Sequence, residues 1–358
     1  MLSFVYNGLP ARVIFGSGTI ADLPSEVDRL GLSRVLVLSA PAQEADARGI
    51  CDRLGKLSAG LYPHATMHTP VSRTDDALAV VRDRNIDGFV AIGGGSTTGL
   101  SKALAYRTDL PQIIIPTTYA GSEMTPILGE THEGQKHTKS STRILPEVVI
   151  YDVDLTMTLP ASVSGTSGMN AMAHAVEAMY AKDRNPVISL IATDAVKTLA
   201  LALPRVIDNP LDKDARADAL YGAWLSGICL GSVGMALHHK LCHVLGGLFD
   251  LPHADTHAVI LPHVLAYNAP AVPDAIERLK DALRTTDPAA ALFDLADRLG
   301  AKTSLAEIAG SMSLDDLEQA AQVASQNQYW NPRTIEIESI RSLLQNAWTG
   351  NLRTQNGS

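Results

Sequence analysis

The chain has 358 residues, of which 46% are hydrophobic and 19% charged, a composition typical of a folded globular protein. This length is more than one small core needs and favours two domains. The formal net charge of −9 argues against nucleic acid, and no uninterrupted apolar run reaches the ~18 residues of a membrane span, so we expect neither kind of partner. Three scattered cysteines match neither a disulfide framework nor a CxxC metal site, which indicates a reducing compartment and a cytoplasmic protein.

Residues 1–157 alternate short apolar, β-branched runs with longer helical patterns such as Thr74–Asn85. Buried runs separated by helices predict a parallel sheet covered on both faces, and such sheets bind ligands at the carboxyl ends of their strands. We therefore predict a Rossmann-like, dinucleotide-binding α/β domain over residues 1–157. The predicted strands are Arg12–Phe15, Val35–Leu38, Gly88–Ile92, Ile113–Ile115 and Val148–Tyr151.

The run GFVAIGGGS, residues 88–96, predicts a buried strand that enters a glycine-rich turn and then a helix. Glycines allow a ligand to approach the backbone, and the helix start offers unpaired N–H groups to a pyrophosphate. Gly94, Gly95 and Ser96 are therefore candidate cofactor residues. The spacing differs from G-x-G-x-x-G, so a plain tight turn is the alternative.

A second loop, IIIPTTYAGSEMTP, runs from the next strand into hydroxyl-rich residues that suit ribose or nicotinamide contacts. Its candidates are Thr117, Thr118 and Ser122, although simple turn chemistry explains the same composition. The strand Val35–Leu38 ends in Ser39, where sites that prefer NADH place a carboxylate for the ribose 2′-hydroxyl. We therefore expect NADPH to be accepted alongside NADH.

Residues 158–358 have helical periodicity throughout and predict an all-α domain, with the active site in the cleft between the two domains. The predicted helices cover residues 165–181, 187–204, 214–233, 236–248, 275–285, 288–300, 303–311, 314–326 and 336–348.

Seven of the eleven histidines lie between positions 174 and 263. Several are paired at helical i, i+4 spacing, which puts both side chains on one face. Buried imidazoles need partners, so a cluster this dense indicates a functional polar pocket rather than chance core histidines. The seven are His174, His238, His239, His243, His253, His257 and His263.

The order GGGS, PTT…GSE, N-x-x-x-H and H-x-x-x-H-x-L-G followed by PH resembles the iron-containing (group III) alcohol dehydrogenases, over nearly the whole chain. The resemblance implies their dehydroquinate synthase-like fold and a homodimer. It places the family's four metal ligands, an Asp and three His, on Asn170, His174, His239 and His253. The family's proton-handling histidine falls on His243, and its ribose-binding lysine on Lys136.

Asn170 stands where the family has its acidic ligand, so the site offers a neutral amide and should bind Fe²⁺ or Zn²⁺ weakly. This departure, the doubled His238–His239 and the segment LPHADTHAVILPH resemble the maleylacetate reductases within the superfamily. The resemblance implies reduction of the C=C bond of maleylacetate to 3-oxoadipate by NADH or NADPH during degradation of aromatic compounds, and no metal is expected.

In this reading His243 or Tyr119 donates the proton, and His174, His239 and His253 bind the developing enolate and the carboxylates. The remaining candidates for the dicarboxylate substrate are Asn170, His238, Lys240, Arg143 and Arg333, although for each of the three cations a solvated surface charge is the favoured interpretation. Two alternatives stay open. One is a metal-dependent alcohol or polyol dehydrogenase, and the other is a non-catalytic nucleotide-binding protein on the same fold.

Overall fold

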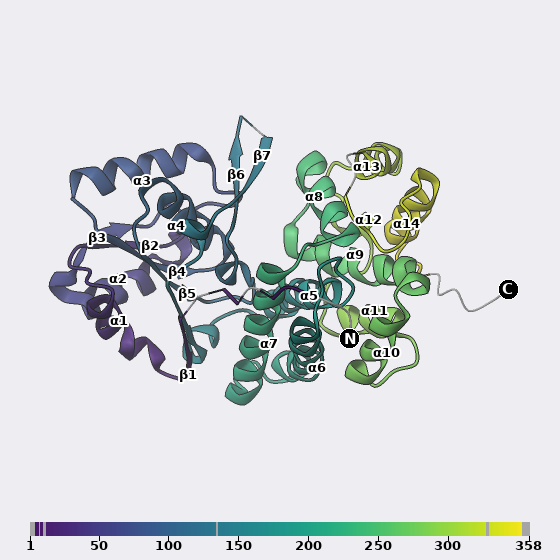
Figure 1. The fold of residues 1–358 in the computed structure, drawn as a ribbon, viewed down its shortest axis with the longest axis horizontal. Coiled ribbons are helices and arrows are strands. Elements are labelled where there is room, and N and C mark those ends of the chain that lie inside the picture. Colours follow the sequence, from purple (N-terminus) through teal and green to yellow (C-terminus); the bar gives the residue numbers. More distant parts are fainter. Residues whose placement is uncertain (1–3, 7, 10–11, 134, 327–328, 353–358) are drawn as a thin grey trace. The chain divides into compact units, whose positions relative to one another are not determined.

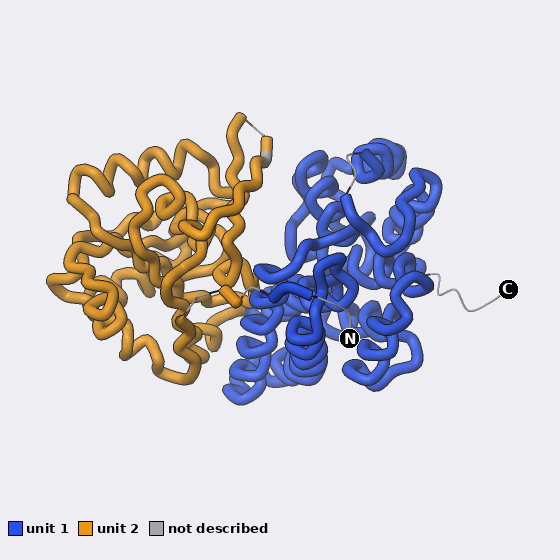
Figure 2. The backbone as a smooth tube through the Cα atoms, viewed as in Figure 1, with its two compact units in different colours: residues 1–7, 160–358 blue, residues 8–159 orange. Residues whose placement is uncertain are grey.

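The computed structural model describes residues 4–6, 8–9, 12–133, 135–326 and 329–352, with the side chain of Lys136 left out. The chain divides into two compact units (Figure 2). Gly8–Leu159 form one, called the sheet unit here, and Met1–Asn7 with Pro160–Ser358 form the other, called the helical unit.

The sheet unit contains a six-stranded parallel sheet in the order β1-β8-β5-β4-β2-β3 (Figure 1). Each of the five predicted strands is present, which confirms the predicted fold class for this half of the chain. The strands are β1 (Arg12–Gly16), β2 (Val35–Leu38), β3 (Ser58–Tyr62), β4 (Gly88–Gly93), β5 (Gln112–Pro116) and β8 (Val148–Asp152). The helices are α1 (Leu23–Arg29), α2 (Glu44–Leu54), α3 (Val71–Asp83) and α4 (Gly95–Thr108).

Both faces of this sheet are buried, because successive residues of each strand point to opposite sides. On one face, Val35 and Val37 of β2 pack with Leu23 of α1 and Ile50 of α2. On the other face, Leu36 and Leu38 pack with residues of α3 and α4. The continuous apolar runs of the sequence are thus explained by helices on both sides.

Three strands were not predicted. β3, with sequence SAGLY, lies at the edge of the sheet and is made largely of small residues, so it lacks a strand signal. β6 (Ile127–His132) and β7 (Gln135–Ser140) form a separate antiparallel hairpin. Their sequences are mostly polar. Glu130 of β6 is buried, and it forms ion pairs with Arg107 and Lys139.

The helical unit consists of helices, as predicted, and no strand occurs in its described residues. Most helices begin and end within a few residues of the predicted limits. They are α5 (Ala161–Ala178), α6 (Pro186–Asp208), α7 (Lys213–Ser232), α8 (Leu237–Phe249), α9 (His253–Asn268), α10 (Pro273–Leu283), α11 (Pro288–Arg298), α12 (Leu305–Ile308), α13 (Asp316–Ser325) and α14 (Ile337–Thr349).

Two helices differ from the sequence prediction. α9 was missed, because Pro262 interrupts its pattern and its first turn is polar, yet it is buried along most of its length. α12 has only four residues where residues 303–311 were expected to be helical. Gly310, with a φ of +56°, lies beyond its end in the left-handed region.

By length and composition, α6 could cross a membrane, and α7 with α8 form a second, sharply bent candidate. In the structure α6 packs against α5, α7 and α10 through Ile188, Val196 and Leu203, which are fully buried. Its charged residues Asp194 and Lys197 interrupt the apolar run. This pattern is that of a helix in the core of a globular unit.

Candidate active site

The glycine-rich turn of the sheet unit joins β4 to α4 and leaves the first turn of that helix uncovered. Gly94 is the N-cap residue, and no side chain caps the helix N–H groups. Gly93 has a φ of +151°, and a Cβ atom there would lie 2.5 Å from Thr97 Oγ1 and 2.6 Å from Gln43 Oε1. Only glycine fits this position without rearrangement. The open N–H groups suit a pyrophosphate, the ligand predicted for Gly94, Gly95 and Ser96.

Three buried hydroxyl oxygens near this turn have no hydrogen-bond partner among the described residues. They belong to Ser39 after β2, Thr97 in α4 and Ser122 in the segment after β5. Strands β2 and β4 are neighbours in the sheet, so the Ser39 and Thr97 hydroxyls lie near the same edge, and Ser122 lies in the segment that leaves the adjacent strand β5. Leaving a buried polar atom unpaired costs about 1–3 kcal/mol, which a bound polar ligand would recover. The residues present therefore fit a dinucleotide.

The segment after β5 packs directly on the glycine turn. Gln43 Nε2 donates to Thr117 Oγ1 at 2.7 Å, and the Thr117 N–H donates to the Gly93 carbonyl at 3.1 Å. Thr118 side-chain atoms lie 3.1 Å from where a Cβ of Gly94 would stand. The structure thus brings together predicted cofactor residues from two separate loops, while their contacts with a cofactor stay predictions.

Three other predicted residues of the sheet unit lie elsewhere. Tyr119 is fully buried, so its phenol offers no surface to a ligand in this conformation. Lys136 belongs to β7, and its side chain lies outside the described residues. Arg143 is exposed and pairs with Asp109 at 3.3 Å. Their predicted roles are not tested by these positions.

In the helical unit, three helices bring the histidines together. α5 presents Asn170 and His174 one turn apart, and α8 and α9 supply the others. The His174 and His239 rings stack at 5.1 Å between centroids, and the His239 and His257 rings meet edge-on at 5.0 Å. Six of the seven predicted histidines therefore form one cluster, while its role as a polar pocket stays a prediction. His243 and His253 lie at its exposed side, with ring centroids 6.3 Å from His239 and 4.4 Å from His257 respectively.

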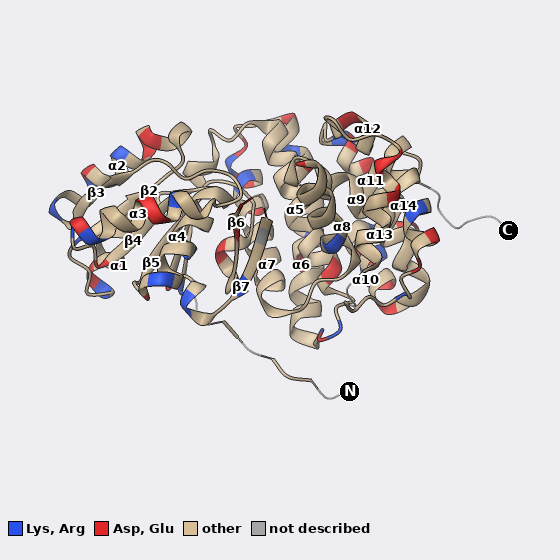
Figure 3. Ribbon diagram, turned by 90° about the horizontal axis from the view of Figure 1, so that it is seen from above, with Lys and Arg blue, Asp and Glu red and all other residues tan. Residues whose placement is uncertain are grey.

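Glu177, which the sequence prediction missed, anchors this cluster. Lys, Arg, Asp and Glu residues are spread over both units (Figure 3). Within α5, all of which the structure describes, Glu177 is the one residue of these four types. It is fully buried and accepts two hydrogen bonds, from His239 Nδ1 at 2.5 Å and from the His238 backbone N–H at 2.8 Å. A carboxylate can only accept, so His239 Nδ1 carries a hydrogen and Nε2 is the ring atom that faces away. The one feature of the sequence that points to Glu177 is its position three residues after His174, on the same face of the predicted helix.

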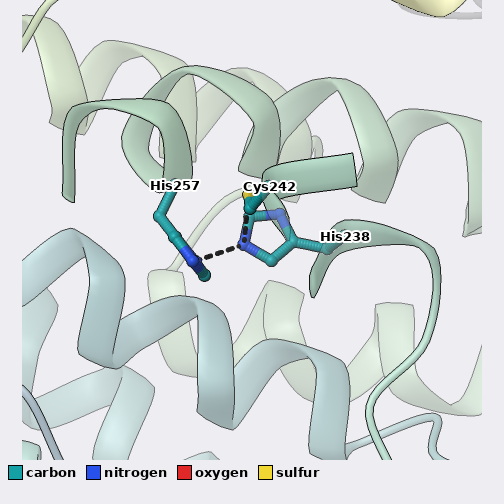
Figure 4. A group of neighbouring side chains, drawn as sticks. All are labelled: His238, Cys242 and His257. Atoms are coloured by element: carbon teal, nitrogen blue, oxygen red, sulfur yellow. Dashed lines mark hydrogen bonds between the residues drawn. The ribbon is translucent and has the colours of Figure 1, made fainter. Parts of the chain in front are cut away.

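His238, Cys242 and His257 form a group of three buried side chains (Figure 4). His238 Nε2 and His257 Nδ1 are 2.9 Å apart, and Cys242 Sγ lies 3.7 Å from His238 Nε2. A tetrahedral ion with ordinary Zn–N bonds separates its nitrogen ligands by about 3.3 Å, so 2.9 Å is a hydrogen bond between imidazoles. His238 is fully buried and forms a hydrogen bond with His257. Its predicted contact with substrate stays a prediction.

Burial lowers the pKa of His174, His238 and His257 well below the ordinary histidine value, and neighbouring imidazoles lower it further. These rings are therefore neutral at neutral pH, and each has one donor and one acceptor nitrogen. Within the described residues, Asn170 Oδ1, His174 Nδ1 and His239 Nε2 lack a hydrogen-bond partner. The cluster can therefore exchange hydrogen bonds with an oxygen-rich ligand.

The four positions of the family's metal ligands do not fit that metal well. Asn170, a neutral amide, occupies the position where the family has its aspartate ligand. The nearby carboxylate of Glu177 is already bound to His239. Among the described histidines, cysteines and carboxylates, ligand atoms converge within 4.8 Å in the His238, Cys242 and His257 group, and not at His174, His239 and His253. A divalent ion prefers a carboxylate with imidazoles, so we derive no chemical step through a metal here.

Lys240 and Arg333, the predicted cations of this unit, both contact aromatic rings. Lys240 Nζ lies 5.6 Å from the ring centre of Tyr329. The Arg333 guanidinium stacks 4.3 Å above Tyr267 and donates to the Tyr267 carbonyl at 2.9 Å. Arg333 thus already has partners in the fold, whereas Lys240 keeps its ammonium on a half-buried surface.

His263 lies further along α9 and contacts Phe293 of α11, with ring centroids 6.3 Å apart. Burial lowers the pKa of His263 to about 4. Its folded pKa is below the unfolded value of 6.5, so the stability it contributes is present above pH 6.5 and is lost as the pH falls toward 4. Over this window, the free energy of unfolding of wild type should fall by about 1.4 kcal/mol per pH unit more than that of H263Q. Urea denaturation of both proteins at each pH measures the difference. Exposed His137 replaced by glutamine is the control, and equal slopes for wild type and H263Q would contradict the prediction.

Comparison with known proteins agrees with this architecture. The model of the iron-containing alcohol dehydrogenase family matches residues 10–153, and that of the family's C-terminal part matches residues 164–348. The maleylacetate reductase of Rhizobium sp. strain MTP-10005 is 54% identical over 98% of this chain and 99% of its own length. That of Sphingobium indicum is 51% identical over 98% of each chain.

Among solved structures, the maleylacetate reductase of Agrobacterium tumefaciens superposes with a TM-score of 0.94 at 54% identity, covering 98% of this chain and 99% of its own. The two family models together cover most of the chain, and these relatives cover nearly all of it. The chain therefore belongs to the iron-containing alcohol dehydrogenase family and, within it, to the group of the maleylacetate reductases.

Proposed function

We propose that the protein reduces the C=C bond of maleylacetate, giving 3-oxoadipate, with NADH or NADPH and without a metal ion. The relatives at 46–54% identity that bear the name maleylacetate reductase support the reaction. Two observations together carry the metal-free mechanism: the position of the family's acidic ligand holds the neutral Asn170, and the nearby Glu177 carboxylate is bound to His239.

For the cofactor, we propose that the open start of α4 binds the pyrophosphate and that Thr117, Thr118 and Ser122 contact the ribose or nicotinamide. When bound, the nicotinamide supplies a hydride to the alkene carbon remote from the ketone. Ser39 after β2 brings no carboxylate that would repel a 2′-phosphate, which supports acceptance of both NADH and NADPH.

For the substrate, hydride addition to the conjugated alkene places negative charge on the ketone oxygen. Donors aimed at that oxygen lower the barrier, because they are already oriented when the charge develops. We propose His174 and His239 there, with the Asn170 amide beside them. Because His239 Nδ1 donates to Glu177, His239 can donate to the enolate only from Nε2 of its imidazolium form. His243, exposed at the edge of the cluster, is the proposed proton donor to the second alkene carbon. Tyr119 is the alternative donor, and its buried phenol must become exposed before it can act.

The substrate's carboxylates need cations or hydrogen-bond donors. Lys240 follows His239 in the chain, and its ammonium lies over Tyr329 on the half-buried surface of α8. We propose Lys240 and His253 as carboxylate ligands. Arg333 and Arg143 are weaker candidates, because each already has partners within its own unit.

The test is turnover of maleylacetate by purified protein before and after treatment with EDTA, with the metal content measured on the same samples. We expect unchanged turnover and no stoichiometric metal. An essential bound metal would overturn the metal-free mechanism, and alcohol oxidation that Fe²⁺ or Zn²⁺ restores would favour the metal-dependent alternative. Tight cofactor binding without turnover of any enoate or carbonyl would favour the non-catalytic alternative. The homodimer and the cytoplasmic location stay predictions.

A further inference from the structure

Lys102 is a buried cation of the sheet unit that the reaction does not use. It lies in the second turn of α4, with 1% of its surface exposed. Its ammonium donates to Ser122 O, to Thr125 Oγ1 at 2.9 Å and to Ile127 O at 3.0 Å. All three acceptors belong to the segment that follows β5. One side chain of α4 therefore holds the far part of this segment, from Ser122 to Ile127, by three hydrogen bonds.

Burying a lysine ammonium costs free energy of desolvation, so its three hydrogen bonds must compensate for that loss. Burial lowers the pKa of Lys102 to about 7, and the nearby Glu123 opposes that shift. Glu123 is itself 1% exposed and accepts from the Tyr151 hydroxyl at 2.7 Å. An apolar residue would avoid this cost but would leave the carbonyl of Ile127 without its lysine donor.

The segment held by Lys102 contains the hydroxyl residues expected at the ribose and nicotinamide, and α4 begins at the turn expected at the pyrophosphate. Before Ile127, the first residue of β6, this segment contains only one short 3-10 helix, Ser122–Met124, so regular structure does little to fix its middle part. Its near end is tied to the turn by Gln43 and Thr117, and its far end is tied to α4 by Lys102.

We propose that Lys102 is a positioning residue for the nicotinamide cofactor, which sets the segment Thr117–Ile127 against α4 so that both parts of the cofactor site are in place before binding. The inference rests on the proposed use of NADH or NADPH. A preorganised site binds more tightly because less ordering has to be done on binding. Loss of the three hydrogen bonds should therefore weaken cofactor binding more than it slows the bound enzyme.

The experiment compares wild type with Lys102→Met, which keeps the length of the side chain and removes its donors. We expect KM and the directly titrated Kd for NADH to rise about tenfold, while kcat changes by about twofold or less. Lys102→Arg should recover part of the affinity, because the guanidinium can donate to the same carbonyls. Thr125→Val, which removes one acceptor, should raise both constants by about threefold.

The control is Arg216→Met, because Arg216 is a fully buried cation of the helical unit that donates to Ser164 Oγ at 2.7 Å. We expect it to lower the unfolding temperature without changing the Kd for NADH. An unchanged Kd in K102M, or in T125V should K102M not fold, would overturn the inference. If wild type binds neither NADH nor NADPH, the proposed function fails instead, which separates the two failures.

Discussion

Replacing Glu177 by glutamine should lower kcat for maleylacetate reduction by about a hundredfold. The carboxylate accepts from both His239 Nδ1 and the His238 N–H, and it fixes which His239 nitrogen carries the hydrogen. Glutamine has one acceptor oxygen, so its amide N–H₂ must face one of these donors, and the His239 ring loses its orientation. Removing a group that orients an active-site imidazole or an oxyanion donor costs about 10²-fold in comparable sites.

This loss should appear in kcat rather than in KM for NADH, because Glu177 and the cofactor residues lie in different units. The matched control is Glu26→Gln in α1. Glu26 is also buried and bound to two cations, Arg12 and Arg29, but it lies outside the histidine cluster. It should cost stability and leave kcat unchanged. A kcat for E177Q close to wild type would mean that His239 does not act on the substrate.

Replacing Asn170 by aspartate should convert the cluster toward a metal site. The amide oxygen is buried without a partner in the described structure and lies one turn before His174. A carboxylate there restores the ligand that divalent ions prefer, so we expect Zn²⁺ to bind at least about a hundredfold more tightly, measured by titration of the apo-protein. Turnover of maleylacetate should fall about tenfold or more, because the new negative charge opposes the enolate.

Asn268→Asp is the matched control for this change. Asn268 is fully buried in the same unit, but its amide already exchanges hydrogen bonds with Asn331 at 2.8 and 3.1 Å. A carboxylate placed there should confer no zinc affinity. If N170D gains turnover together with its metal, the ancestral metal chemistry is still usable in this protein, and the metal-free mechanism is wrong.

The fold was predictable where apolar runs were long and covered on two sides. Strands such as Ile113–Ile115 are continuous β-branched runs, and their burial between two helical layers leaves a clear pattern. The hairpin β6–β7 has no such apolar pattern in its sequence, because its strands are polar and one of its buried residues is the ion-paired Glu130. α9 escaped prediction for a related reason, since its helix is stabilised by packing around Pro262 and not by local propensity.

The histidines of the site were found from spacing alone, since i, i+4 pairs place two imidazoles on one helix face. The role of Glu177 could not be found this way. Its partners His238 and His239 lie about sixty residues further along the chain, and only the packing of α5 against the helices that follow it brings them together. Likewise, spacing along the chain does not show that His257, nineteen residues after His238, forms a hydrogen bond with it.

The pairing of β1 with β8 has a consequence for how the chain is made. Arg12 lies beside Val148, so the first strand gains its hydrogen-bond partner only after the last strand of the sheet has left the ribosome. Closing so long a loop is entropically expensive and slow. Until then β1 is an unpaired apolar edge, open to other nascent chains. We expect this strand to be the segment through which chaperones and aggregation compete for the newly synthesised protein.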